Sequence, residues 1–437
     1  MMKHELARYD AYKKTDSRWF DEAPFHWTSG RVKDFVDVNA VTKVPTNLID
    51  DDLVEFIPMT NVNEELGKIK QFNFTPLKEV SSGYTKFKNG DVIFAKITPC
   101  MENGNCAIVQ GLTYDISYGS TEFMVFRPFQ KLANKYLHYF LHDELFRKNA
   151  EPFMKGTAGQ KRISSHYMAT HYFALPPLPE QQAIAAYLDT KTTQLDRKIA
   201  LLTQKATLYS KLKQSLINET VTRGLDKIVV MKDSGVEWIG EVPEHWGVSA
   251  ITNITTIVSI KNHPKEELLS VYRDYGVIIK STRDDNHNKA GQNLSNYKLV
   301  EQGFLVINKM KAWQGSLGVS EFRGIVSPAY ITCETDKKII ERSYLHHLLR
   351  CRNYINEYNR LSYGVRVDQW DMRYDDFKYV PVLLSPMEEQ KAIADFLDTK
   401  TAHIDRIVET ITIQIDKLKE LRKTLINDVV IGKIKVA

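Results

Sequence analysis

The chain carries PLPEQQAIAAYLDTKTTQLDR at residues 177–197 and PMEEQKAIADFLDTKTAHIDR at residues 386–406. The two stretches align without a gap at a constant separation of 209 residues. The match resumes further on, where Leu216-Ile217-Asn218 corresponds to Leu425-Ile426-Asn427. A fixed period of this kind marks a duplicated structural unit. We therefore expect two copies of one architecture in this chain.

Both copies have the apolar spacing of a long amphipathic helix. Apolar residues at alternating steps of three and four form a narrow stripe that suits one helical partner. One rung of each stripe holds a cation, Lys213 or Arg422. The pattern favours pairing of the two helices with each other, and leaves open that each packs on its own neighbouring domain. The predicted seam consists of Leu195, Ile199, Leu202 and Leu216 in the first copy and Ile404, Val408, Ile411, Ile415, Leu418 and Leu425 in the second.

Signals at the helix ends give expected helical segments of 177–224 and 385–437. Ser385 is expected to cap the second helix, with Pro386 in its first turn and Glu388 at the capping-box position. Gly224 and Gly432 are expected to end the two helices. Only about 20 residues join the first helix to the next globular block, so the second helix is expected to return antiparallel to the first.

A globular block precedes each helix, and each block has the usual size of one domain. Both blocks open on Pro-x-His-Trp, at Pro24–Trp27 and Pro243–Trp246. We interpret this opening motif as a buried structural feature. Further in, both blocks read as a glycine turn and a short apolar strand that ends at a lysine, Lys96 in the first block and Lys309 in the second.

Polar loops that contain glycine follow these strands in the same order in both blocks. The sequences are Cys100–Asn105 and Lys155–Arg162 in the first block, and Lys311–Ser316 and Ser362–Arg366 in the second. Glycine lets the backbone approach a phosphate, while Lys, Arg and Gln donate hydrogen bonds to phosphates and base edges. A cation in a glycine turn is also often merely solvated. The shared order, more than any one loop, favours binding of nucleic acid.

Composition narrows the class of protein. A hydrophobic content of 43% predicts folded domains with buried cores, and a net charge of +5 permits an anionic partner without requiring one. No stretch approaches the roughly 18 uninterrupted apolar residues of a membrane helix, and MMKHELARYD lacks the apolar segment of a secretory signal. A cytoplasmic location is therefore expected. The four cysteines form no CxxC pair, so we expect reduced packing residues and no metal site.

Taken together, four of these segments resemble the specificity subunit of type I restriction and modification systems. They are Pro177–Ala185, Pro386–Ala394, Val236–Gly240 and Asn308–Gly315. The resemblance covers nearly the whole chain. It implies an α+β fold in which two α/β target recognition domains are separated by an antiparallel coiled coil of two long helices, with pseudo-twofold symmetry. The first domain, with an N-terminal arm, would comprise residues 1–176, and the second residues 225–384.

The function that this resemblance implies is recognition of a bipartite, asymmetric DNA target. Each domain would read one half-site of the double-stranded DNA, and the coiled coil would set the unread gap. Partners would be two methyltransferase subunits and two motor-nuclease restriction subunits, with no membrane. S-adenosylmethionine, ATP and Mg²⁺ are expected on those partners, and no cofactor on this chain.

The predicted DNA contacts combine these loops with neighbouring cations. Lys161 and Arg162 suit phosphates, and Gln314 has the amide geometry for an adenine edge. In the second block, Phe304 stands where the first has Asp91, so loop details are expected to differ between the halves. The full predicted set is Lys96, Arg127, Lys155, Lys161, Arg162, Lys309, Lys311, Trp313, Gln314 and Arg366.

Two alternatives remain open. A fused methyltransferase needs an Asn or Asp, two prolines and an aromatic residue, but the double proline Pro176-Pro177 has leucine on both sides, and no glycine-rich phosphate loop is present. Adjacent acids such as Asp284-Asp285 and Asp375-Asp376 suit solvated turns better than a metal nuclease. The second alternative is a scaffold whose domains bind protein. Its binding would respond little to salt, whereas binding through several phosphates weakens steeply.

Overall fold

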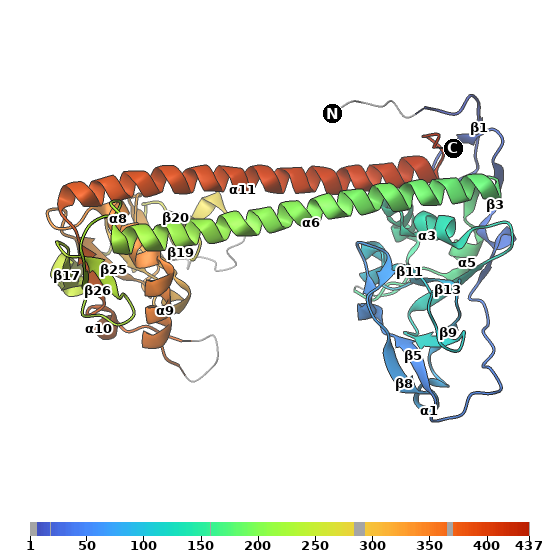
Figure 1. Cartoon of the computed structure of the whole chain (residues 1–437), viewed down its shortest axis with the longest axis horizontal. Coiled ribbons are helices and arrows are strands. Elements are labelled where there is room, and N and C mark those ends of the chain that lie inside the picture. Colours follow the sequence, from blue (N-terminus) through green and yellow to red (C-terminus); the bar gives the residue numbers. More distant parts are fainter. Residues whose placement is uncertain (1–6, 18, 158, 284–292, 365–369, 437) are drawn as a thin grey trace. The chain divides into compact units, whose positions relative to one another are not determined.

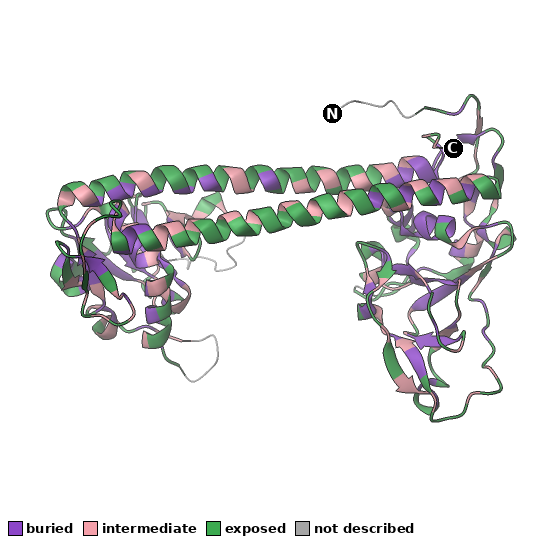
Figure 2. Ribbon diagram, in the orientation of Figure 1, coloured by how far each residue is buried: buried purple, intermediate pink, exposed green. Residues whose placement is uncertain are grey.

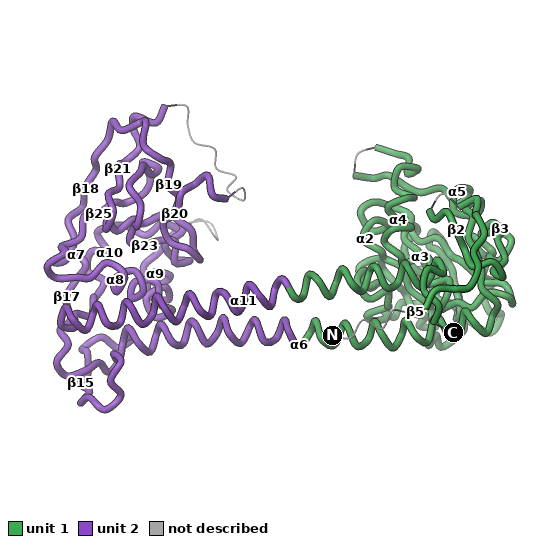
Figure 3. Tube along the Cα trace, turned by 90° about the horizontal axis from the view of Figure 1, so that it is seen from above, with its two compact units in different colours: residues 1–201, 414–437 green, residues 202–413 purple. Residues whose placement is uncertain are grey.

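The structure is a computed structural model that describes residues 7–17, 19–157, 159–283, 293–364 and 370–436. It divides into two compact units, shown in Figure 3. Unit 1 comprises residues 1–201 and 414–437, and unit 2 comprises residues 202–413. We expected boundaries at the ends of the long helices, but each helix is shared between the units. The reason is that each hydrophobic core includes the first turns of one long helix and the last turns of the other.

The two longest elements are helices α6 (Leu178–Arg223) and α11 (Met387–Val430), labelled in Figure 1. At a rise of about 1.5 Å per residue they extend for roughly 69 and 66 Å. Gly224, with φ +77°, directly follows α6, and Gly432, also with φ +77°, lies two residues beyond α11. The left-handed conformation that glycine tolerates thus ends both helices near the expected positions.

The expected cap of the second helix is wrong. The hydroxyl of Ser385 is buried without a hydrogen-bond partner, and the carbonyl of Pro386 accepts the first hydrogen bonds of α11 from Glu389 N and Gln390 N, at 2.9 and 3.0 Å. Glu388 pairs with Lys391 at 3.2 Å instead of reaching back to the cap. Gln390 holds the backbone just before this helix start, because its Nε2 donates to Ser385 O at 2.8 Å.

The domain of unit 1 is built around two four-stranded sheets. One is antiparallel with the strand order β4-β13-β10-β11, and the other has the order β8-β5-β12-β9 with a parallel β5/β12 pair. Helices α3 (Asn134–His142) and α4 (Glu144–Ala150) follow these strands. The strands are β4 (Val36–Val38), β5 (Leu53–Ile57), β8 (Asn73–Pro76), β9 (Thr85–Phe87), β10 (Val92–Ala95), β11 (Cys106–Ile108), β12 (Ser117–Gly119) and β13 (Phe123–Pro128).

Unit 2 repeats the antiparallel sheet with the same connectivity, in the order β18-β25-β22-β23. Two antiparallel pairs, the hairpin β19/β20 and the pair β21/β24, replace the second sheet of unit 1. Helices α8 (Arg342–Arg350) and α9 (Arg352–Leu361) follow, as α3 and α4 do in unit 1. The strands are β18 (Thr255–Val258), β19 (Leu269–Tyr272), β20 (Gly276–Ile279), β21 (Lys298–Val300), β22 (Leu305–Ile307), β23 (Leu317–Val319), β24 (Gly324–Val326) and β25 (Ile331–Thr335).

Within each unit the long helices run antiparallel. In unit 1 Arg422 lies 3.1 Å from Asp196, and in unit 2 Lys213 lies 2.6 Å from Asp405. These cations occupy equivalent positions of the sequence repeat, and so do the aspartates, so the two pairs are reciprocal. All ten predicted seam residues are buried or half-buried, and burial alternates along both helices in Figure 2. The cation that interrupts each apolar stripe therefore meets an acid on the facing helix.

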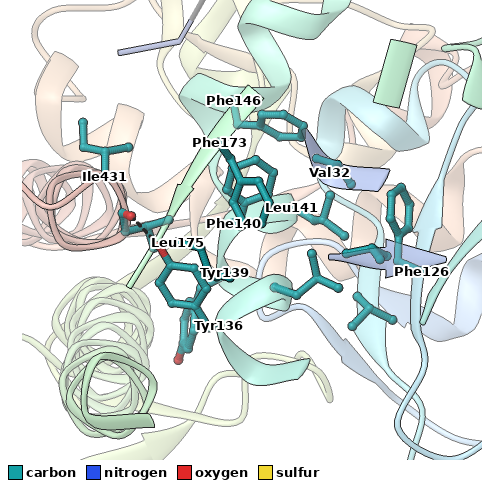
Figure 4. Packing of buried hydrophobic residues seen from close by; sticks show 14 of the residues in the cluster. Val32, Phe126, Tyr136, Tyr139, Phe140, Leu141, Phe146, Phe173, Leu175 and Ile431 are labelled. Carbon is teal, nitrogen blue, oxygen red and sulfur yellow. Dashed lines mark hydrogen bonds between the residues drawn. The ribbon is translucent and has the colours of Figure 1, made fainter. Parts of the chain in front are cut away.

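Aromatic side chains fill the core of unit 1. Figure 4 shows Phe140, Phe146 and Phe173 in contact, with ring centroids 4.7 Å apart for Phe140 and Phe146 and 4.9 Å for Phe140 and Phe173. Ile431, just beyond α11, joins the same cluster. Three of the four cysteines, Cys106, Cys333 and Cys351, are buried and unbridged, as expected of packing residues. The expected fold class, α+β with two domains and two long helices, is confirmed.

A joint made by the duplicated Glu-Gln pair fixes each domain to the start of its long helix. Strand β3 (Thr28–Arg31) pairs with β14 (Tyr172–Leu175) in unit 1, and β17 (Gly247–Ala250) pairs with β26 (Pro381–Leu384) in unit 2. These pairings bring the opening motif to the helix start. Glu180 accepts hydrogen bonds from Trp27 Nε1 at 3.1 Å and lies 2.8 Å from His26 Nε2, and Glu389 repeats both contacts with Trp246 and His245.

The glutamine of the joint bonds only to the backbone. Gln181 accepts from Ala133 N at 2.8 Å and donates to Lys131 O and Pro176 O at 2.9 and 2.8 Å. Gln390 makes the equivalent three bonds in unit 2. Trp27 and Trp246 are each 1% exposed. The opening motif is therefore structural, as interpreted from the sequence, and the joint holds the recognition loops at a set place on each helix.

Candidate nucleic-acid interface

Two loops meet at the end of the same strand in each unit. Lys96 directly follows β10, and Lys309 lies two residues after β22. The carbonyl of Lys96 accepts from Ile163 N at 2.9 Å, and that of Lys309 accepts from Met372 N at 3.0 Å. In unit 1 a strand-end loop (96–104) thus lies beside a return loop that is described at residues 155–157 and 159–162. In unit 2 the strand-end loop (309–315) lies beside the described ends of the return loop, residues 363–364 and 370–371. Two loops that are distant in sequence form one site in each domain.

The loop pair of unit 1 gathers four of the predicted cations. Lys155 and Arg162 exchange backbone hydrogen bonds at 3.0 and 2.8 Å, which makes the return loop a small ribbon. Lys161 O accepts from Thr98 N at 2.9 Å, which places the ribbon beside Lys96. The side chains of Lys155 and Lys161 are exposed. The result is a basic face with glycines at the tip of the ribbon, where Gly156 has φ +138° and Gly159 has φ +81°.

Arg162 is partly committed within the protein. Its guanidinium donates two hydrogen bonds to Glu122, at 2.9 and 2.7 Å. This contact lowers the pKa of the Glu122 carboxyl below its ordinary value. Because the pair is exposed, an incoming phosphate competes with Glu122 for the same guanidinium at little cost.

The loop pair of unit 2 is more aromatic. Lys309 Nζ lies 3.1 Å from Asp371 Oδ2, whereas the side chain of Lys311 is exposed. Trp313 and Gln314 lie in a short 3-10 helix, η5 (Ala312–Gln314), and both are half-buried. This site therefore combines an amide, a free lysine and aromatic rings, where unit 1 presents mainly positive charge.

One predicted contact, Arg127, does not join these sites. Arg127 donates two hydrogen bonds to the buried carboxylate of Asp91, both at 2.7 Å, and further bonds to Val41 O at 2.9 Å and Thr42 Oγ1 at 2.7 Å. These bonds give Arg127 a structural role, so it does not belong among the proposed contacts. Phe304 stands in the second block where the first has Asp91, and it packs in an apolar cluster. The expected difference between the two halves is therefore found at this position. Arg366 lies outside the described residues.

Sequence reasoning missed Trp370 and Tyr363. The Trp370 ring lies 5.2 Å from that of Trp313, and Tyr363 lies beneath the guanidinium of Arg373 at 4.9 Å. Both lie in the described ends of the return loop of unit 2, which the sequence had assigned on its glycine and arginine alone. An aromatic residue on each side of a glycine-containing basic loop is the signal that could have identified them.

The described residues contain no group of three or more His, Cys, Asp or Glu side chains placed to hold a metal ion. Among the described helices, none has a long enough apolar run to cross a bilayer.

A family model described as the type I restriction modification DNA specificity domain matches the chain twice, at residues 24–207 and 243–417. The two matches cover most of the sequence and fall on the two copies of the duplicated architecture. The expected recognition role agrees with this family, since the matched model describes a DNA specificity domain.

Several curated relatives carry the same description. The chain is 37% identical to the specificity subunit of the type I restriction enzyme EcoAI from Escherichia coli, over 37% of this chain and 27% of that subunit. The chain is 30% identical to the EcoEI specificity subunit from the same species, over 38% of this chain and 28% of that subunit. The chain thus spans just over a quarter of the length of these two relatives. The putative MjaX specificity subunit of Methanocaldococcus jannaschii is 21% identical over 99% of this chain and 98% of its own length.

Two solved structures share the fold along the chain. One comes from work on complex assembly and conformational transition of the type I R-M system. It has a TM-score of 0.71 at 18% identity, over 94% of this chain and 99% of its own. The other is the HsdS subunit from Thermoanaerobacter tengcongensis, with a TM-score of 0.55 at 17% identity, over 96% of this chain and 100% of its own.

Proposed function

The chain belongs to the family of type I restriction modification DNA specificity domains, and from this we propose that its two domains read the two unlike halves of one DNA target. The observation that carries the proposal is the loop pair at the end of β10 and β22. It recurs in the same place in both units, yet its side chains differ. Since base edges are read by side chains, equal placement with unlike chemistry suits an asymmetric, bipartite site.

The proposed contacts fall into two kinds. Lys96, Lys155, Lys161 and Arg162 in unit 1, with Lys311 in unit 2, would bind phosphates, which position a protein without reading sequence. Gln314 would read an adenine edge, because its amide offers a donor and an acceptor at once. Lys309 would contribute if a phosphate replaced Asp371 as its partner in this half-buried pair.

We further propose that α6 and α11 set the unread gap and hold the partner subunits. Support comes from the antiparallel pairing within each unit and from apolar side chains left outside the seam. Leu208 and Leu212 of α6 are 56% and 53% exposed, a stripe on which two methyltransferase subunits would dock. Two restriction subunits would then join the assembly, and S-adenosylmethionine, ATP and Mg²⁺ would be bound by these partners.

The proposal is tested by expressing the chain with its methyltransferase subunits and mapping methylated adenines across the host genome. The expected result is one split target with two different halves. Affinity for that target should fall by orders of magnitude between low and moderate salt, because each phosphate contact releases counterions. A salt-insensitive interaction would instead support the protein-binding scaffold.

Two substitutions separate the kinds of contact. Gln314→Ala should relax recognition at one base pair, at a cost of about 1–3 kcal/mol in discrimination. Lys161→Ala should weaken binding to all sequences alike and reduce the salt dependence by about one counterion. Lys211→Ala, an exposed lysine of α6, is the control and should leave both quantities unchanged. Equal effects of Gln314→Ala and Lys161→Ala on every sequence would contradict these roles.

A further inference from the structure

Trp313 and Trp370 form an aromatic pair beside the recognition loops of unit 2. Their ring centroids lie 5.2 Å apart and the ring planes are inclined by 56°. Both side chains are half-buried, so part of each ring meets solvent. The other four tryptophans of the chain lie in or against the two main hydrophobic cores: Trp19, Trp27, Trp238 and Trp246. The Trp313–Trp370 pair is therefore not part of either core.

The protein holds this pair firmly in place. Trp313 follows Ala312, which is fully buried, and Trp313 Nε1 donates to Met310 O at 3.2 Å. A Cβ on the nearby Gly315 would come within 2.8 Å of the Ile355 side chain, so η5 lies tightly against α9. Trp370 precedes Asp371, whose backbone exchanges hydrogen bonds with Tyr363 at 3.3 and 3.1 Å. The Trp313 ring is thus anchored by its own loop, and the backbone next to Trp370 is held by the Tyr363–Asp371 pair.

Unit 1 shows that the fold does not require this pair. Gly104 and Gly315 end the two strand-end loops in the left-handed conformation, and counting back from them places Glu102 opposite Trp313. Counting back from Ile163 and Met372, which both donate to the strand-end lysine, places Lys161 opposite Trp370. Charged residues thus occupy in unit 1 the positions that hold tryptophans in unit 2. The aromatic pair belongs to what is particular to the second half-site.

On the premise that the domains bind DNA, we propose that Trp313 and Trp370 read the 5-methyl group of a thymine in the half-site of unit 2. Tryptophan has no acceptor, and the one donor of Trp313 is already used, so the Trp313 ring suits apolar contact. Sandwiching a flat base would need parallel rings about 7 Å apart, twice an aromatic contact distance. Rings inclined at 56° do not fit that arrangement, and their solvent-exposed parts would form a wedge-shaped apolar notch that suits a methyl group.

The positive charge near the two tryptophans suits binding of a thymine that lies in duplex DNA. Lys311 is exposed in the same loop, and Lys309 pairs with the partly exposed Asp371. Cations that contact phosphates would hold the major groove against the notch, and the thymine methyl group is the apolar feature of that groove. Gln314, next to Trp313, would read the neighbouring base pair.

The test uses the full chain purified with its methyltransferase subunits, and duplexes that carry its mapped target. Each thymine of the target is replaced in turn by deoxyuridine, which removes the methyl group and keeps the base pairing. One replacement should lower the affinity of the wild-type protein about fourfold, as expected for roughly one buried CH₂ group. Trp313→Ala and Trp370→Ala should bind the two duplexes equally, while Lys161→Ala should keep the fourfold ratio.

A wild-type protein indifferent to every replacement would overturn the inference, as would tryptophan variants that keep the ratio. If the proposed DNA recognition were itself wrong, the wild-type protein would not distinguish its target from unrelated DNA, which separates this failure from the one above. A second measurement does not depend on how the variants fold. With 5-bromodeoxyuridine at the sensitive position, irradiation should cross-link the DNA to the wild-type chain, at the peptide that contains Trp313 or Trp370. Cross-links confined to other residues would exclude the proposed contact.

Discussion

Arg127 shows how a cation in a DNA-recognition domain serves the fold instead of the ligand. Its partner Asp91 is 1% exposed and also accepts from Lys88 N at 2.8 Å. The hydrogen bonds to Asp91 raise the pKa of Arg127 above its ordinary value. Removing one member of such a pair leaves the other charge buried without compensation, which costs more than the pair itself contributes.

We therefore expect Arg127→Ala to lower the free energy of unfolding of unit 1 by about 3 kcal/mol. The double variant Arg127→Leu with Asp91→Leu should recover much of this loss, since no charge is left buried. Urea unfolding measures both effects. Arg162→Ala is the matched control, because its pair with Glu122 is exposed and should matter far less to stability. A loss that is as large for Arg162→Ala would show that burial is not the cause.

His138 makes the stability of unit 1 depend on pH. It is 8% exposed and stacks on His142, with centroids 5.5 Å apart. Burial lowers the pKa of His138 to about 4, whereas an unfolded histidine titrates near 6.5. The unfolded chain thus binds the proton more readily, so the contribution is intact above about pH 6.5 and is lost as the pH falls toward 4.

His138→Gln, which cannot take up the proton, should reduce the loss of stability between pH 7 and pH 5 by about 2 kcal/mol, from 1.36 kcal/mol per pKa unit. The measurement is urea unfolding at both pH values, and the comparison between them removes any constant cost of the substitution. His166→Gln, at an exposed position of the same domain, should leave the difference as in the wild type. An unaltered difference in His138→Gln would refute the assignment.

At the scale of residues, the sequence predicted the order of strands and loops along the chain better than it predicted which side chains contact each other. It identified Lys96 and Lys309 at strand ends because a glycine turn and a short apolar run are local signals. It could not assign Arg127 to Asp91, since the two lie 36 residues apart and meet only when β10 pairs with β13. Likewise, Ser385 fits a capping pattern, but α11 begins at Met387, so the capping position falls on Pro386 and the Ser385 hydroxyl is buried. Trp370 becomes notable only beside Trp313.

At the scale of elements, the start of each long helix depends on one buried glutamine. Gln181 is fully buried and satisfies three backbone groups of unit 1. Sequence repetition marked Glu180 and Gln181 as special, but only the β3/β14 pairing shows why. That pairing brings residues about 150 positions apart to one corner of the domain.

Gln181→Ala should lower the free energy of unfolding of unit 1 by at least about 2 kcal/mol, because buried peptide groups would lose their partners. Gln390→Ala should have a similar effect in unit 2. Hydrogen exchange of the first turns of α6 and α11 would locate the loss. The neighbouring Gln182 is exposed, so Gln182→Ala should change stability by less than about 0.5 kcal/mol. Equal losses at Gln181 and Gln182 would argue against the joint.

At the scale of the whole molecule, the proposed spacing function gives a numerical expectation. Seven residues inserted near the middle of α6, and seven at the facing position of α11, add two helical turns and keep the apolar seam in phase. The helices would lengthen by about 10 Å, which is close to 3 base pairs at about 3.4 Å each. Mapping of methylated sites should show a gap longer by that amount with both half-sites unaltered. An unchanged gap would refute the spacing function.

The backbone-only bonding of Gln181 and Gln390 has an evolutionary consequence. Their partners are peptide groups, which every amino acid except proline supplies in full, so substitutions other than proline at residues 131, 133 and 339 need not loosen the joint. The loops beyond β10 and β22 can then diverge while the domain stays fixed to its helix. New target preferences can arise by drift in the loops without rebuilding the frame that carries them.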